Sequence, residues 1–122
     1  MNNKLKIGII GCGFMGRMHG TVYSLLDKAE LSACVDINSE TAKKYSADFS
    51  VNSYTSLEEM LMHEEIDVID ICVPTYLHKE FTIRSAQAGK GIVCEKPMAL
   101  TVEDAQEMIS ACDQNNVRLM IA

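Results

Sequence analysis

Short apolar runs recur along the chain, and segments with helical periodicity separate them. The runs occupy positions 5–10, 30–36, 51–54, 67–73, 91–94 and 117–122. Several of them are β-branched and apolar at consecutive positions, which is typical of strands that are buried on both faces. The alternation of such strands with helices predicts an α/β fold with a doubly wound parallel sheet, whose ligands bind at the carboxyl ends of the strands.

The predicted helices follow from apolar spacing and from capping residues. Met18, Val22, Leu25 and Leu26 form a stripe that predicts a helix running to about residue 27 or 28, with Arg17, His19 and Ser24 at its exposed positions. Arg17, in the first turn, is either a phosphate contact or a solvated arginine, and His19 either packs beside the cofactor loop or is structural. A short helix is expected over 39–45, and another is expected over 76–88, ended by Gly89. Ser56 and Thr101 begin two more as capping residues. The expected buried stripe of the last helix is Ala105, Met108, Ile109 and Cys112.

The first apolar run leads into three glycines, Gly11, Gly13 and Gly16, at a G-x-G-x-x-G spacing. Gly11 permits a sharp turn, Gly13 leaves room for a diphosphate, and Gly16 lets the following helix pack closely on the strand. The first amides of that helix would face the ligand at the positive end of the helix dipole. The spacing, with a strand before it and a helix after it, predicts a phosphate-binding loop, although an ordinary strand-turn-helix gives the same pattern.

Asp36 ends the second apolar run, twenty positions after Gly16. A carboxylate at this place can accept hydrogen bonds from both ribose hydroxyls of an adenosine. It would oppose a 2′-phosphate, because like charges about 4 Å apart at an effective dielectric of about 20 repel by roughly 4 kcal/mol. No arginine follows nearby, so the sequence favours NAD over NADP. The alternative is an aspartate that only caps a helix or a turn.

Composition restricts the class of protein. The 122 residues are enough for one domain, and the net charge of −6 argues against binding to nucleic acid or to anionic membranes. No apolar run is long enough for a membrane span, and the start has no signal peptide, so we expect a soluble, cytoplasmic protein. The five cysteines form no C-x-x-C pair, so neither a metal site nor a disulfide framework is expected.

Two further groups of candidates follow predicted strands and should reach the same sheet edge. Pro74 and Thr75 follow the fourth strand, and Glu95-Lys96-Pro97 follows the fifth. Lysine suits acid/base chemistry on an alcohol, although a surface lysine before a turn proline is an equal alternative. His78 would lie in the first turn of its helix, and it is either near the site or a helix-surface histidine.

These elements together resemble the N-terminal domain of the glucose-fructose oxidoreductase, inositol dehydrogenase and rhizopine-catabolism family. The resemblance covers nearly the whole chain, and its most specific part is Glu95-Lys96-Pro97. The other matching segments are Gly11 to Gly16 with His19, and Pro74-Thr75-Tyr76-Leu77-His78.

The resemblance implies a Rossmann NAD(P)-binding fold and hydride transfer between NAD and a sugar, a cyclitol or a related polyol. It implies that Lys96 is catalytic, near the nicotinamide and the substrate, and that Glu95 contacts the cofactor side. The expected cofactor contacts are Gly11, Gly13, Phe14, Met15, Gly16, Asp36, Ile37, Pro74, Thr75, His78, Glu95 and Lys96.

Two departures from the family qualify these expectations. Thr75 stands where the family often has asparagine, which leaves one cofactor contact open. The family's second domain, an α+β substrate domain, has no counterpart in these 122 residues. We therefore expect a truncated cofactor domain that binds NAD weakly and turns over nothing alone, and a homo-oligomer.

Two other hypotheses remain open from the sequence. One is a non-catalytic NAD-binding sensor or interaction module. The other is a structural role in which the apolar run at 117–122 pairs with another copy at the sheet edge.

Overall fold

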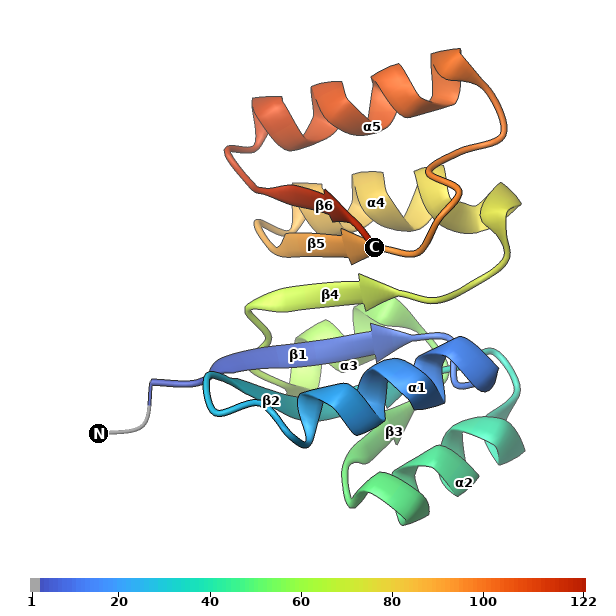
Figure 1. Cartoon of the computed structure of the whole chain (residues 1–122), viewed down its shortest axis with the longest axis vertical. Helices are drawn as coiled ribbons and strands as arrows, with labels where there is room; N and C mark the ends of the chain where they lie inside the picture. The colour runs from blue at the N-terminus through green and yellow to red at the C-terminus, as the bar shows by residue number, and fades with distance from the viewer. Residues whose placement is uncertain (1–2) are drawn as a thin grey trace.

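A computed structural model describes residues 3–122. Six strands form one sheet in the order β3-β2-β1-β4-β5-β6, and every neighbouring pair is parallel (Figure 1). The predicted doubly wound sheet is therefore confirmed. The strands are β1 (Leu5–Ile10), β2 (Ala29–Val35), β3 (Asn52–Tyr54), β4 (Val68–Ile71), β5 (Gly91–Cys94) and β6 (Leu119–Ile121). The helices are α1 (Phe14–Tyr23), α2 (Ser39–Phe49), α3 (Leu57–His63), η1 (Thr75–Leu77), α4 (His78–Gln87) and α5 (Val102–Gln114).

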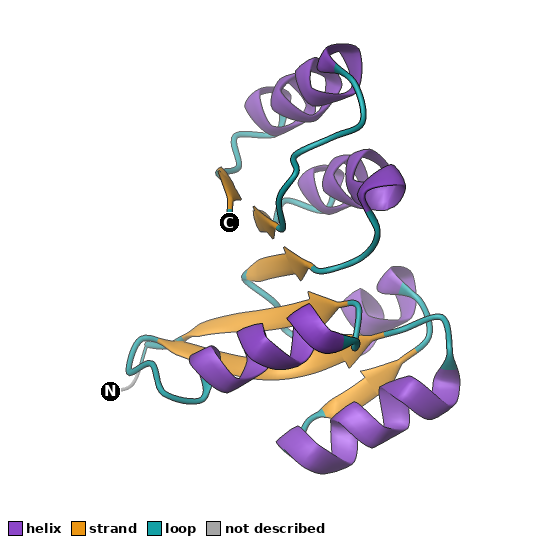
Figure 2. Ribbon diagram, turned by 45° about the vertical axis from the view of Figure 1, so that its right-hand side comes forward, coloured by secondary structure: helices purple, strands orange, loops and turns teal. Residues whose placement is uncertain are grey.

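Two apolar cores lie on opposite faces of this sheet (Figure 2). Side chains of α1 and α2 cover the first face, where Ile9, Cys34 and Tyr45 are buried. Helices α3, α4 and α5 cover the second face over a larger core that includes Ile69 and Ile71. Because successive strand residues point to opposite faces, Asp70, between these two isoleucines, points toward the α1 face. In the described part of the chain, no helix has the length and apolarity that a membrane span requires.

Helix α1 packs differently from the prediction. It ends at Tyr23, and its buried residues are Gly16 and Gly20, whereas Met18 and Val22 are about half exposed. A Cβ on Gly20 would lie 2.2 Å from the Tyr45 hydroxyl, so the helix approaches its neighbours through glycine. Close packing through small residues leaves the larger apolar side chains outside. The stripe therefore indicated a helix correctly but placed its buried face wrongly.

Other element boundaries differ by a few residues. Helix α2 continues to Phe49, whose ring stacks on Tyr45 at 4.4 Å, and Ser50 ends it with a φ of 57°. The helix expected from residue 76 begins with the short η1 turn before α4. Ser56 and Thr101 cap α3 and α5 as predicted, but Ile109 is 47% exposed rather than buried.

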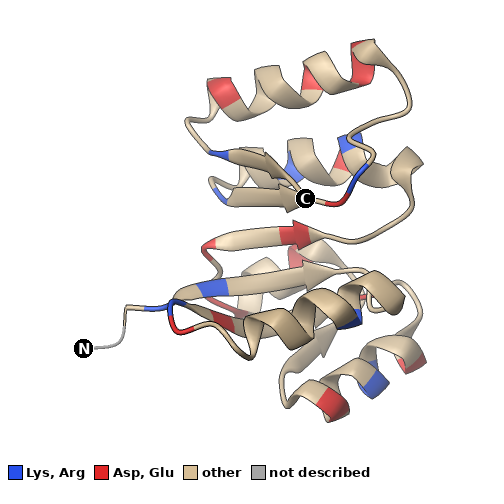
Figure 3. Ribbon diagram, viewed as in Figure 1, with Lys and Arg blue, Asp and Glu red and all other residues tan. Residues whose placement is uncertain are grey.

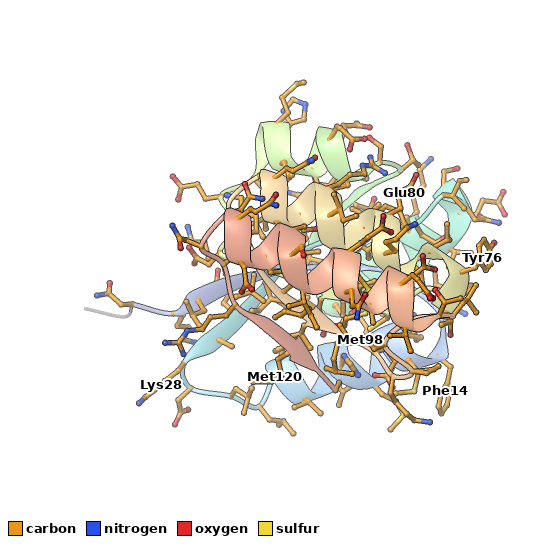
Figure 4. The ribbon with its side chains drawn as sticks, turned by 90° about the horizontal axis from the view of Figure 1, so that it is seen from above. Phe14, Lys28, Tyr76, Glu80, Met98 and Met120 are labelled. Atoms are coloured by element: carbon orange, nitrogen blue, oxygen red, sulfur yellow. The ribbon has the colours of Figure 1, made fainter. Side chains whose placement is uncertain are left out.

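The carboxyl ends of the strands lie at one edge of the sheet, and the predicted site residues follow them. Figure 3 shows adjacent acidic and basic residues in the loop after β5, which are Glu95 and Lys96. Figure 4 shows exposed Phe14 and Tyr76 at the same end of the molecule, opposite Lys28.

Candidate functional site

The first and third glycines of the loop after β1 are fixed by backbone packing. Gly11 has a φ of +101°, and a Cβ there would lie 2.3 Å from the Cys72 carbonyl oxygen. A Cβ on Gly16 would lie 1.9 Å from the carbonyl oxygen of Gly11. The Gly11 amide also donates to the Val35 carbonyl at 2.8 Å, which ties the loop to β2. Side chains at these two positions are thus excluded by the protein itself.

Gly13 differs, because a Cβ on it would meet nothing within 4 Å. It is exposed and precedes the first residue of α1, whose first turn carries no acidic residue. The space beside Gly13 at this helix end is therefore open, which suits an anion such as a diphosphate. Beside it, Phe14 is 77% exposed and Met15 is half-buried, so both lie where a ligand on the loop could contact them.

Asp36 lies beside this loop and already accepts two backbone hydrogen bonds. Its Oδ2 accepts from the amide of Cys12 at 3.0 Å, and its Oδ1 accepts from the amide of Asn38 at 2.9 Å. Each carboxylate oxygen keeps a further lone pair. The two amides fix the orientation of a half-buried carboxylate, and the neighbouring Ile37 is 94% exposed. The structure thus gives Asp36 a turn-supporting role that leaves room for further hydrogen bonds.

A cavity of about 590 Å³ lies between the glycine loop, Asp36 and the start of α4. It is on the sheet face covered by α3 and α4. Its lining includes predicted cofactor contacts (Gly11, Gly13, Asp36, Ile37 and Pro74). It also includes residues that were not predicted to contact a cofactor (Thr55, Ser56, Leu57, Tyr76, Leu77, Phe81 and Arg84). The sequence predicted Ser56 as a helix cap, but its place beside the glycine loop depends on how α3 packs on the sheet.

On the other face, His19 links three elements. Its Nδ1 lies 2.7 Å from Asp70 Oδ2 on β4, and its Nε2 lies 2.9 Å from Glu95 Oε2 after β5. The prediction that His19 lies on an exposed helix face is wrong, since its side chain is only 17% exposed. Helix α1 packs by its glycines, and this turns His19 toward the sheet.

Asp70 is fully buried and was not selected from the sequence. Its Oδ2 also accepts a hydrogen bond from the Tyr23 hydroxyl at 2.6 Å. Burial, together with the nearby Asp70 carboxylate, raises the pKa of Tyr23 and that of the Cys72 thiol. His19, Asp70 and Cys72 offer nitrogen, oxygen and sulfur atoms within 4.8 Å of one another, and hydrogen bonds join them in this arrangement.

The segment after β5 is held from both sides. The amide of Glu95 donates to the Ile71 carbonyl at 3.0 Å, and its side chain binds His19. Lys96 is exposed, and it forms no ion pair within residues 3–122. The peptide bond between Lys96 and Pro97 is cis.

His78 is buried, so the alternative of a helix-surface histidine is wrong. Its Nδ1 lies 2.9 Å from the Pro97 carbonyl oxygen, and its Nε2 lies 2.9 Å from that of Val73. The side chain therefore joins the loop after β4 to the loop after β5. A direct contact of His78 with a cofactor stays a prediction, as do those of exposed Pro74 and half-buried Thr75.

Arg17, a candidate for a phosphate contact, is occupied elsewhere. Its guanidinium pairs with Asp48 and lies over the Tyr45 and Phe49 rings, 5.8 and 5.5 Å from their centroids. Cys12, in the middle of the glycine loop, is buried. The pKa of its thiol is raised mainly by a hydrogen bond with Cys34 and, to a smaller extent, by burial. Neither side chain projects freely toward the loop opening.

Known proteins resemble this chain over nearly its whole length. The structure of the WlbA dehydrogenase from Bordetella pertussis, in complex with NADH and UDP-GlcNAcA, superimposes with a TM-score of 0.94 at 35% identity, and the match covers 98% of this chain and 37% of that one. The D-apiose dehydrogenase of Paraburkholderia graminis is 35% identical over 97% of this chain and 32% of its own length. The scyllo-inositol 2-dehydrogenase (NADP(+)) IolW of Bacillus subtilis is 33% identical over 96% and 32%.

The chain thus spans about a third of the length of these relatives. A family model described as "Oxidoreductase family, NAD-binding Rossmann fold" matches residues 5–122, which include every predicted site residue. The parallel sheet, the glycine loop and this match agree on one assignment. The chain belongs to the glucose-fructose oxidoreductase, inositol dehydrogenase and rhizopine-catabolism family, as its NAD-binding domain.

Proposed function

We propose that the chain binds NAD and, joined to a substrate-binding domain, serves a dehydrogenase that transfers hydride between NAD and a sugar, a cyclitol or a related polyol. The observation that carries this proposal is the cavity of about 590 Å³ between the open glycine loop and the Asp36 carboxylate. The named activities of the relatives, on D-apiose and on scyllo-inositol, support a polyhydroxylated substrate.

In this proposal, each end of the cavity holds a different part of the dinucleotide. The adenosine half occupies the apolar space near Leu57 and Phe81, and the diphosphate binds the amides that follow Gly13. The ribose hydroxyls donate to the free lone pairs of Asp36, which the amides of Cys12 and Asn38 hold in place. NAD supplies or accepts the hydride, and these residues bind and orient it.

Asp36 also favours NAD over NADP. A 2′-phosphate on the adenosine ribose would bring a second negative charge close to the carboxylate, and no described ion pair neutralises Asp36. One relative carries NADP in its name, so the preference is a property to be measured on this chain.

Lys96 is the proposed acid/base group. An amine at the end of β5 can exchange a proton with a substrate hydroxyl when a neighbouring positive charge or desolvation favours its neutral form. In support, Lys96 is exposed at the ligand edge and is not engaged by a carboxylate of residues 3–122. Its negative neighbour Glu95 is instead paired with His19.

The cofactor preference can be tested with Asp36→Asn. This variant keeps a similar shape and one acceptor oxygen but removes the charge, so we expect NADH affinity to fall and NADPH affinity to rise. The ratio of the two dissociation constants should change by at least about tenfold, which corresponds to about 1.4 kcal/mol. Titration with NADH or NADPH, followed by the change in cofactor fluorescence, measures the two dissociation constants.

The matched control is Asp27→Asn, which removes the same charge from an exposed position outside the cavity lining. It should leave the ratio unchanged. Equal affinities for NADH and NADPH in the unmodified chain would contradict the proposed role of Asp36, and no binding of NADH at millimolar concentration would contradict the proposed function.

A further inference from the structure

Lys96 lies between two anchored residues. On one side, Oε2 of Glu95 lies 2.9 Å from Nε2 of His19. On the other side, the carbonyl oxygen of Pro97 lies 2.9 Å from Nδ1 of His78, and that of Met98 lies 3.3 Å from the same atom. The two histidines come from opposite sides of the sheet, since His19 belongs to α1 and His78 begins α4.

The His19 ring lies between two carboxyl groups that are shielded from water. One ring nitrogen is 2.7 Å from Oδ2 of Asp70, and the other is 2.9 Å from Oε2 of Glu95. Asp70 is fully buried and also accepts a hydrogen bond from the Tyr23 hydroxyl. The Glu95 side chain is only 15% exposed, so water screens its bond with His19 less than it would on an open surface.

This pairing changes the role expected for Glu95. Its Oε2 is directed to His19 and not to the cavity, and Glu95 does not line that cavity. The backbone amide of Glu95 is fixed by the Ile71 carbonyl as well. Main chain and side chain of Glu95 are therefore both held immediately before Lys96.

We propose that His19 is a positioning residue that orders Lys96 through its contact with Glu95. The chain of contacts runs from β4 through α1 to the end of β5. The importance of these contacts for catalysis rests on the proposed function of Lys96. The ordering of Lys96 can nevertheless be measured in the chain without a cofactor. Such a link would preorganise the amine and so avoid ordering the loop during the reaction.

Two substitutions of His19 separate its contacts. The amide of asparagine reaches about as far as Nδ1, so His19→Asn can still donate to Asp70 but loses Glu95. The amide of glutamine reaches about as far as Nε2, so His19→Gln can still donate to Glu95 but loses Asp70. Tyr23→Phe is the matched control, because it removes a hydrogen bond to Asp70 without touching Glu95.

The measurement is ¹⁵N relaxation of the Glu95 and Lys96 amides in the chain without NAD. We expect order parameters near about 0.85 in the unmodified chain, in His19→Gln and in Tyr23→Phe, and values toward about 0.6 in His19→Asn. Glu95→Ala removes the same contact between His19 and Glu95 and should give the same order parameter for Lys96 as His19→Asn. The test therefore holds even if His19→Asn does not fold.

Unchanged order parameters in both His19→Asn and Glu95→Ala would overturn the proposal. An equal decrease in Tyr23→Phe or in His19→Gln would also overturn it, since the effect would then follow general loss of packing around Asp70. An NADH titration on the same samples tests the proposed function separately, because the relaxation result does not depend on bound cofactor.

Discussion

Replacing Gly16 with alanine should destabilise the chain by about 3 kcal/mol or more. The new Cβ would lie 1.9 Å from the carbonyl oxygen of Gly11, which belongs to the backbone and cannot rotate away. Relief of this contact requires α1 to move from β1, and that movement would disturb the packing of Gly20 against Tyr45 as well. Urea denaturation followed by circular dichroism measures the free energy of unfolding.

Gly13→Ala is the matched control for this experiment. Gly13 has a φ of −84°, which alanine adopts freely, and its Cβ would meet nothing within 4 Å. The cost in stability should stay below about 1 kcal/mol, since only the helix cap changes. NADH affinity should nevertheless fall in Gly13→Ala, because the methyl group would occupy the position proposed for the diphosphate. Equal stability of the two variants would contradict the packing argument.

Lys96→Ala should lower turnover by about 10²- to 10⁴-fold in a protein that joins this chain to its substrate-binding domain. This range is the usual contribution of a general acid or base. NADH affinity should change far less, because the proposed NAD contacts lie mainly at the glycine loop and at Asp36. Steady-state kinetics with a polyol substrate, together with NADH titration, separate the two effects.

Lys28→Ala is the control for the lysine experiment, since Lys28 is exposed at the end of the molecule opposite the site (Figure 4). It should leave turnover unchanged. A non-catalytic NAD sensor would instead keep its response to NAD in Lys96→Ala, so retention of full function in that variant would favour the sensor hypothesis over the dehydrogenase.

Much of the fold could be predicted because strand patterns and caps are local features. Adjacent residues correctly predicted the strand before Gly11 and the strand that ends just before Asp36. They also correctly predicted Ser56 and Thr101 as helix caps. The family resemblance is confirmed by the match over residues 5–122. The predicted buried face of α1 was wrong, because an apolar stripe does not indicate the buried face of a helix that packs through its glycines.

The contacts between distant residues could not be predicted in the same way. His19 and Asp70 are 51 positions apart, and their hydrogen bond depends on the adjacency of β1 and β4 in the sheet. An aspartate inside an apolar strand was a visible signal, since a buried carboxylate needs a partner. Nothing local indicated that its partner would be His19, or that His78 would bind the carbonyls beyond Lys96.

The placement of the two halves of the site on opposite faces of the sheet has a consequence for divergence and redesign. The cavity lies on the α3 and α4 side, while His19, Asp70 and Glu95 lie on the α1 side, and the glycine loop stands between them. Under the role proposed for Asp36, substitutions beside it that change the cofactor preference would leave the contacts of His19 with Asp70 and Glu95 in place. An engineer could then change the nucleotide preference and keep the proposed positioning of Lys96.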